Sequence, residues 1–164
     1  MISKILIANR GEIAVRIIRA AKELGMKTVL VHSTVDKNSL AVKMADKSIC
    51  IGPPPALESY LFYQNILSAA ISVKADAIHP GYGFLAENPF FAEACKALKI
   101  VFIGPHSDVI HKMGDKAKAK LIMEKFGIPV VPGSKGVISS INEAMTVVEK
   151  VGFPVIFKAS AGGG

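Results

Sequence analysis

The chain has 164 residues, a hydrophobic fraction of 51% and a formal net charge of +7 at pH 7. This length is enough for one domain, or one domain with part of another, whose core needs no disulfide bonds. The charge does not indicate nucleic-acid binding, because the basic residues are spread over predicted helix faces without interleaved aromatic residues. No apolar run reaches membrane-spanning length. We therefore expect neither a nucleic acid nor a membrane as a partner.

The two cysteines, Cys50 and Cys95, lie in apolar stretches without CxxC spacing. This pattern favours reduced thiols with a structural role in a cytosolic protein. A predicted strand begins at Lys4, which leaves no room for a signal or transit peptide before it. The sequence therefore predicts a cytoplasmic protein.

The first 105 residues alternate short apolar runs with amphipathic segments, a pattern typical of a doubly wound α/β domain. Strands are predicted at 4–8, 28–32, 48–51, 75–79 and 100–103, and helices at about 12–24, 63–73 and 89–98. The apolar stripe of the first helix is predicted to consist of Ile13, Ile17, Ala20, Ala21 and Leu24. A strand, a helix and a second strand in this order imply a right-handed crossover and a parallel sheet.

The sequence after residue 105 changes character. Short helices are predicted at about 107–112 and 116–126, and extended structure begins again at Val130. Ser140 and Glu143 have the spacing of a capping box, which opens a helix that ends before a glycine. We interpret the residues from about 128 onward as the beginning of a second domain.

The last twelve residues combine a predicted strand at 155–157 with Lys158 and three closing glycines. Glycines allow backbone N–H groups to converge on an anion, and a lysine at a strand end supplies positive charge. The segment is thus typical of a polyphosphate site. A flexible linker after an edge strand is the alternative.

Two predicted loops, 9–12 and 79–88, follow the carboxyl ends of strands, where ligands of open parallel sheets bind. The run from Gly81 to Ala86 formally matches the dinucleotide fingerprint GxGxxG/A. We discount this match, because the next helix starts only after Asn88-Pro89 and the next strand ends without an acidic residue. An NAD-binding oxidoreductase is therefore disfavoured.

The histidines are interpreted conservatively. His79 ends a predicted strand before a proline, and a structural role is favoured over metal ligation. His106 and His111 bracket a short helix without carboxylates or thiolates at ligand spacing, so we predict no zinc site.

Several stretches taken together resemble the biotin carboxylase family of the ATP-grasp superfamily. They are KILIANRGEIA at 4–14, Ala45-Asp46 with 50–52, IHPGYGFLAEN at 78–88, FIGP at 102–105, MGDK at 113–116, VPGS at 131–134 and FKASAGGG at 157–164. They occur in family order and correspond to the amino-terminal third of such an enzyme. The resemblance implies a Rossmann-like domain at 1–105, a helical linker at 106–127 and the incomplete start of an ATP-grasp domain at 128–164.

The resemblance also implies a reaction, in which ATP phosphorylates bicarbonate to carboxyphosphate. Carbon dioxide from this intermediate is then transferred to a ureido nitrogen of biotin on a carrier protein. Mg²⁺ or Mn²⁺ is the implied metal cofactor. The metal-binding glutamates and the catalytic residues of the family match positions beyond Gly164, so residues 1–164 alone are expected to hydrolyse no ATP.

The resemblance implies roles for particular residues. Lys116 and Lys158 match the family lysines that hold the ATP phosphates. Three further ATP-binding positions, the start of the family's flexible loop, are Gly162, Gly163 and Gly164. The loop that borders the biotin and bicarbonate end of the site contains Tyr82, Gly83 and Glu87.

Arg19 and Glu23 match positions in the homodimer interface of the family, although alone they form an ordinary exposed i, i+4 pair. Biotin carboxyl carrier protein and carboxyltransferase subunits are the other implied partners. The favoured complete enzyme is acetyl-CoA carboxylase, which serves fatty acid synthesis. The alternatives are a pyruvate or propionyl-CoA carboxylase, another ATP-grasp ligase such as a carbamoyl-phosphate synthetase, and a non-catalytic basic binding module.

Overall fold

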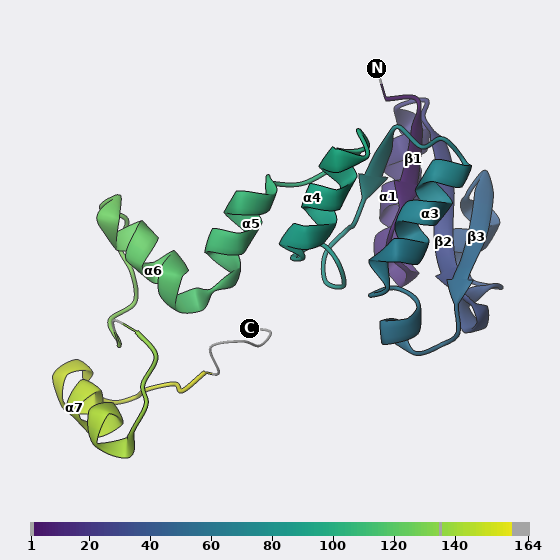
Figure 1. Ribbon diagram of the computed structural model, residues 1–164. Helices are drawn as coiled ribbons and strands as arrows, with labels where there is room; N and C mark the ends of the chain where they lie inside the picture. The colour runs from purple at the N-terminus through teal and green to yellow at the C-terminus, as the bar shows by residue number, and fades with distance from the viewer. Residues whose placement is uncertain (1, 135, 159–164) are drawn as a thin grey trace. The chain divides into compact units, whose positions relative to one another are not determined.

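The computed structural model describes residues 2–134 and 136–158, except for the side chains of Lys116 and Ala117. The chain divides into two compact units, residues 1–110 and 111–164 (Figure 1). None of the helices in the described part is both long and apolar enough to cross a bilayer.

A parallel sheet of five strands forms the centre of the first unit, in the order β3-β2-β1-β4-β5. The strands are β1 (Lys4–Ile7), β2 (Lys27–Ser33), β3 (Lys47–Gly52), β4 (Ala77–His79) and β5 (Val101–Phe102). Every neighbouring pair is parallel. The strand order reverses at β1, which lies between β2 and β4. This arrangement confirms the predicted doubly wound α/β fold.

Helices cover both faces of the sheet (Figure 1). On one face Ile7 and Leu30 pack with residues of α1 (Gly11–Glu23) and α2 (Leu40–Met44). On the other face Leu6 and Ile78 pack with residues of α3 (Tyr63–Ser72) and α4 (Pro89–Ala97). Successive residues of a strand point to opposite faces. Burial on both sides therefore explains why Ile5, Leu6 and Ile7 of β1 are all apolar instead of alternating with polar residues.

The buried face of α1 differs from the predicted stripe. Ala14, Ile18 and Ala21 are buried, whereas Ala20 is exposed and Leu24 is 74% exposed. The buried residues follow i, i+4, i+7 spacing, so the correct stripe is rotated by about one position. Leu24 is the C-cap residue and lies beyond the last helical turn.

Local capping chemistry behaves as predicted at α4. The Asn88 side chain accepts a hydrogen bond from the N–H of Phe91 at 3.1 Å, and Pro89 occupies the first turn.

The two cysteines differ in burial, although both lie in apolar stretches of the sequence. Cys95 is buried and Cys50 is exposed. Cys50 lies in β3, which is an edge strand of the sheet. Two short 3₁₀ helices, Thr34–Asp36 after β2 and Ala56–Glu58 after β3, were not predicted.

The described part of the second unit is helical. It contains the end of α5 (Ser107–Gly114), α6 (Lys116–Lys125) and α7 (Ile141–Val151). Ser140 caps α7 as predicted by accepting from the N–H of Glu143 at 3.2 Å. The Glu143 carboxylate accepts from the N–H of Ser139 at 2.9 Å, one residue earlier than a capping box requires. Gly152 ends the helix with a φ of +79°.

The predicted strand at 155–157 is not formed, and Val130 belongs to no strand either. None of the described residues of 111–158 belongs to a strand. A strand needs a partner for its backbone N–H and C=O groups, and the apolar pattern alone cannot supply one. Phe153, Ile156 and Phe157 accordingly remain 82%, 83% and 66% exposed.

Asp76 ties the amino-terminal segment to the residues before β4. Its carboxylate accepts from the N–H of Ser3 at 2.8 Å, the hydroxyl of Ser3 at 2.7 Å and the N–H of Lys4 at 2.8 Å. These hydrogen bonds, with the Ser3 hydroxyl as the largest contribution, lower the pKa of Asp76 to about 2. A group whose pKa is lower in the folded state stabilises the fold above its unfolded pKa and loses this effect as the pH falls through its folded pKa.

We expect Asp76→Asn to lower the melting temperature at pH 7, and the difference from the wild type to shrink between about pH 4 and pH 2. Thermal unfolding followed by far-ultraviolet circular dichroism at several pH values measures this. Glu58→Gln, which makes the same charge change at an exposed residue, is the control. A difference for Asp76→Asn that is equally large at pH 7 and pH 2.5 contradicts the prediction.

Candidate functional site

The turns after β1 and β4 meet because these two strands are neighbours in the sheet. Asn9 follows β1 and is fully buried. Its side-chain nitrogen donates to the carbonyl of Pro80 at 2.8 Å and to that of Tyr82 at 2.9 Å. Its side-chain oxygen accepts from the N–H of Arg10 at 2.8 Å. The two loops that the sequence placed at this edge are therefore joined by one buried amide.

The backbone beyond β4 is shaped by glycines. Gly81 has a φ of +66°, and a Cβ there would lie 2.7 Å from both Asn9 Nδ2 and Ile13 Cγ2. Gly83 has a φ of +69° with open space around it. His79 Nδ1 accepts from the N–H of Gly81 at 3.0 Å. Burial lowers the pKa of His79, which agrees with a neutral, structural histidine.

The predicted residues of this loop lie at its surface. The Tyr82 side chain is 59% exposed, and Gly83 and Glu87 are exposed as well. Phe84 and Leu85 are turned inward and belong to the core or pack against it. The loop thus exposes an aromatic ring, the backbone of a glycine and a carboxylate to solvent.

A polar cluster that sequence reasoning missed lies beside the loop. Asp36 accepts from Nε and Nη2 of Arg10 at 2.9 and 2.8 Å, from the hydroxyl of Tyr60 at 2.8 Å and from that of Ser33 at 3.0 Å. These bonds, chiefly those from Arg10, lower the pKa of Asp36 to about 2. The Tyr60 ring stacks on Phe84 at a centroid distance of 5.1 Å. The partners lie up to 50 positions apart in the printed sequence, so no local motif could have revealed them.

The second unit contains a cavity of about 950 Å³, a volume typical of small-molecule sites. Its lining includes Lys120 and Lys158, the hydroxyl residues Ser134, Ser139 and Ser140, and the apolar residues Val131, Met145, Ile156 and Phe157. Lys158 is exposed, so its ammonium group is accessible. The mixture of ammonium, hydroxyl and apolar groups suits a ligand with an anionic end and a flat apolar end.

Lys120 was not predicted as a site residue. Its ammonium group donates to the Ser134 carbonyl at 3.3 Å. It lies four residues after Lys116, and residues at this spacing share one helix face, so the sequence did contain a signal for it.

Of the other predicted ATP-binding groups, the Lys116 side chain and Gly162, Gly163 and Gly164 lie outside the described residues. Arg19 and Glu23 are exposed, one turn apart on α1.

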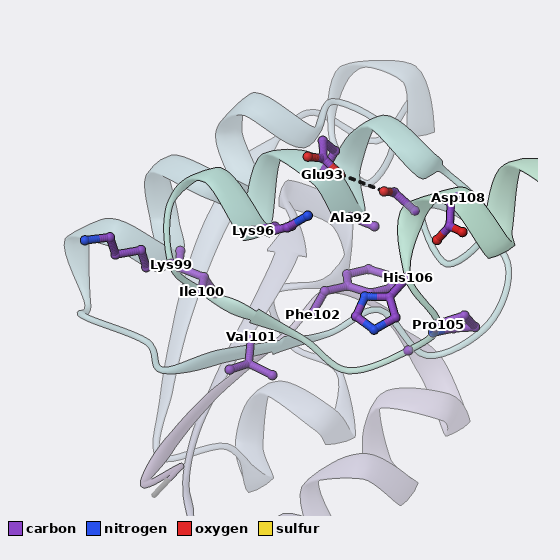
Figure 2. Close-up of a pocket in the computed structure, with 12 residues that line it drawn as sticks. Ala92, Glu93, Lys96, Lys99, Ile100, Val101, Phe102, Pro105, His106 and Asp108 are labelled. Carbon is purple, nitrogen blue, oxygen red and sulfur yellow. Dashed lines mark hydrogen bonds between the residues drawn. The ribbon is translucent and has the colours of Figure 1, made fainter.

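A second cavity, of about 560 Å³, lies at the β5 edge of the first unit. Figure 2 shows Phe102 and His106 on one side of it and α4 on the other. The Ser107 hydroxyl donates to the Glu93 carboxylate at 2.7 Å, and both residues line the cavity. None of the residues singled out from the sequence as site residues lines this cavity.

Family models match almost the entire chain. The model described as biotin carboxylase, N-terminal domain, matches residues 1–110. The model described as carbamoyl-phosphate synthase L chain, ATP binding domain, matches residues 115–164.

The similar proteins match over the full chain. Biotin carboxylase 1 of Bacillus subtilis is 56% identical over 164 residues, which are 100% of this chain and 36% of that protein. A crystal structure of the biotin carboxylase domain dimer of 2-oxoglutarate carboxylase from Hydrogenobacter thermophilus, in complex with MgADP, ADP and bicarbonate, has a TM-score of 0.93 at 51% identity. The match covers 100% of this chain and 36% of the Hydrogenobacter chain. The biotin carboxylase of Campylobacter jejuni, crystallised as a β-γ-ATP complex, has a TM-score of 0.93 at 50% identity. This match covers 100% of the present chain and 37% of the Campylobacter chain. The chain therefore spans roughly a third of the length of these relatives.

The two loop glycines make a matched pair of mutations. We expect Gly81→Ala to lower the free energy of unfolding by about 2–4 kcal/mol, because both the left-handed backbone and the contact with Asn9 oppose a Cβ. Gly83→Ala shares the backbone penalty but has open space, so a loss of about 1–2 kcal/mol is expected. Urea unfolding measures both. Equal losses would mean that the contact with Asn9 is not tight.

Proposed function

The chain belongs to the biotin carboxylase N-terminal domain family, and we propose that it forms the amino-terminal part of an ATP-dependent ligase that carboxylates biotin. In the proposed reaction, ATP phosphorylates bicarbonate to carboxyphosphate and releases ADP. Carboxyphosphate then yields phosphate and carbon dioxide, which a ureido nitrogen of biotin attacks to give carboxybiotin. The observation that carries the proposal is the 56% identity to a biotin carboxylase along all 164 residues.

The domain organisation follows from the same proposal. We place a Rossmann-like domain at 1–105, a helical linker at 106–127 and the beginning of an ATP-grasp domain at 128–164. The helices α5 and α6 lie in the proposed linker, and the two family matches leave residues 111–114 between them.

Lys158 is proposed to bind the ATP phosphates from the wall of the cavity in the second unit. Phosphoryl transfer is catalysed mainly by positioning and by stabilising negative charge, and an accessible ammonium group serves both. Lys116 and the three glycines Gly162, Gly163 and Gly164 are proposed to share this role, and Lys120 adds positive charge to the same wall. The apolar residues of the cavity are suited to the adenine ring.

Mg²⁺ or Mn²⁺ is the proposed metal cofactor, and it would reduce the negative charge of the phosphates. Among the described residues no group of three or more His, Cys, Asp and Glu side chains could hold a metal ion. The family resemblance places its ligands beyond Gly164, and we derive no step through it. The crystal structure of the Hydrogenobacter relative in complex with MgADP and bicarbonate supports Mg²⁺, a nucleotide and bicarbonate as ligands.

Tyr82, Gly83 and Glu87 are proposed to border the biotin and bicarbonate end of the site. An aromatic ring beside bare backbone can contact the apolar edge of the biotin bicycle while a backbone group meets its ureido unit. The proposed macromolecular partners are biotin carboxyl carrier protein, carboxyltransferase subunits and a second copy that contacts Arg19 and Glu23. The description of the Hydrogenobacter relative as a dimer supports the last of these.

Acetyl-CoA is the proposed acyl acceptor of the complete enzyme, in the cytoplasm and in fatty acid synthesis. The alternatives are pyruvate, propionyl-CoA and 2-oxoglutarate, the last because a related module belongs to a 2-oxoglutarate carboxylase. Another ATP-grasp ligase is the alternative from outside this group, since residues 115–164 match the ATP-binding domain of carbamoyl-phosphate synthase.

Phosphate release from ATP by the complete protein separates these alternatives. We expect release to require bicarbonate and to increase when biotin is added. Release that depends on ammonia or glutamine instead, without any effect of biotin, would favour a carbamoyl-phosphate synthetase.

Replacement of Lys158 tests the nucleotide site. In the complete enzyme Lys158→Ala should raise KM for ATP by about 10- to 100-fold and lower kcat, because a charged hydrogen bond to phosphate is lost. Lys118→Ala is the control, since Lys118 is 59% exposed, lies 3.7 Å from Asp115 and does not line the cavity. Steady-state kinetics at varied ATP concentration measures both variants. Equal effects would mean that ATP binding depends on the total positive charge of this region and not on Lys158 in particular.

A further inference from the structure

The exposed pair Tyr82 and Gly83 lies between two points at which the loop is fixed to the core. The first is Asn9, whose buried side chain binds the carbonyls of Pro80 and Tyr82 at 2.8 and 2.9 Å. Both donors of the amide are used on the loop, and its oxygen is used on the N–H of Arg10. The loop backbone therefore depends on a donor at this position, because a side chain that only accepts would face two carbonyl oxygens.

The second fixed point is Phe84, which follows Gly83. Its φ of +40° is unusual for an aromatic residue, and such a conformation persists only when the surroundings hold it. The Tyr60 ring stacks on Phe84 at 5.1 Å with an angle of 23° between the planes. Tyr60 is itself 2% exposed, so it reaches the loop from the core side only.

Tyr60 is linked to the turn that carries Asn9 through a shared partner, Asp36. Its hydroxyl donates to Asp36 at 2.8 Å and accepts from the N–H of Ser33 at 3.0 Å. Arg10, the neighbour of Asn9, binds the same carboxylate with two nitrogens at 2.8 and 2.9 Å. Paired N–H···O bonds of this kind combine strength with a fixed geometry. The turn after β1 thus supports the loop directly through Asn9, and indirectly through Arg10, Asp36 and Tyr60.

We propose that Asn9 and Tyr60 are positioning residues, which hold Tyr82 and Gly83 in the orientation that receives the biotin ring. The inference rests on the proposed function for its ligand, and on the contacts above for the positioning itself. Loops that bind substrates are usually mobile. Here the two supports remove that freedom before the substrate arrives, which lowers the entropic cost of binding.

The central experiment replaces Asn9 by aspartate in the complete enzyme. Asn9→Asp keeps size and shape and still accepts from Arg10, but it turns an acceptor toward the carbonyls of Pro80 and Tyr82. We expect kcat/KM for biotin to fall about 10-fold or more, with KM for ATP changed less than about twofold. Biotin-independent, bicarbonate-dependent ATP cleavage should fall clearly less than kcat/KM for biotin.

Asn65→Asp is the matched control. Asn65 lies in α3, and its side chain donates to the Ile51 carbonyl at 2.9 Å, which is the same kind of bond away from the loop. This variant should lose stability without a selective loss for biotin. If wild-type enzyme responds to biotin and both variants have equal kcat/KM for biotin, the positioning role is wrong. If the wild type does not respond to biotin at all, the proposed function fails instead.

Variants of Tyr60 test the second support and cover the case that Asn9→Asp does not fold. Tyr60→Leu removes the stacked ring and should lower kcat/KM for biotin, whereas Tyr60→Phe keeps the ring and should lower it less. Hydrogen exchange of the peptide covering 80–88 gives a readout without catalysis. We expect faster exchange there in Asn9→Asp and Tyr60→Leu than in Asn65→Asp, and equal exchange in all three would overturn the proposal.

Discussion

The side-by-side pairing of β1 and β4 is the constraint on which the candidate site of the first unit depends. Parallel neighbours end at the same edge of a sheet, so the turns that follow them must share space. The ladder continues beyond β1, where the N–H of Ala8 donates to the His79 carbonyl at 2.9 Å. Asn9 comes next and closes the gap between the two turns. Its burial costs little, because every hydrogen-bonding group of the side chain is used.

Much of the first unit could be predicted because its determinants are local. A strand buried on both faces must be apolar throughout, and ILIA at 5–8 has this property. Asn88-Pro89 carries the chemistry of a helix start in two adjacent residues. The approximate positions of the five strands and of α1, α3 and α4 follow from such signals, and the parallel direction of the strands follows from their connections.

The features that escaped prediction depend on partners distant in the sequence. The predicted strand at 155–157 has a suitable composition, but a strand also requires a neighbouring backbone, which composition does not encode. The role of Asp36 depends on Arg10 and Tyr60, which come from different elements. Even the stripe of α1 was misjudged by one position, because the face that a helix buries is chosen by the sheet against which it packs.

The two candidate regions differ in how their polar groups are satisfied, and this difference bears on how each can bind a ligand. In the loop of the first unit, buried donors and acceptors fix the backbone, so only Tyr82, Gly83 and Glu87 face solvent. In the cavity of the second unit, Lys158 is exposed and Lys120 contacts a single carbonyl at 3.3 Å. Both lysines line this cavity, and two positive charges there favour an anionic ligand. The first region thus presents a fixed backbone, which suits the neutral ring proposed as its ligand. The second contains two ammonium groups, which suit the phosphates proposed as its ligand.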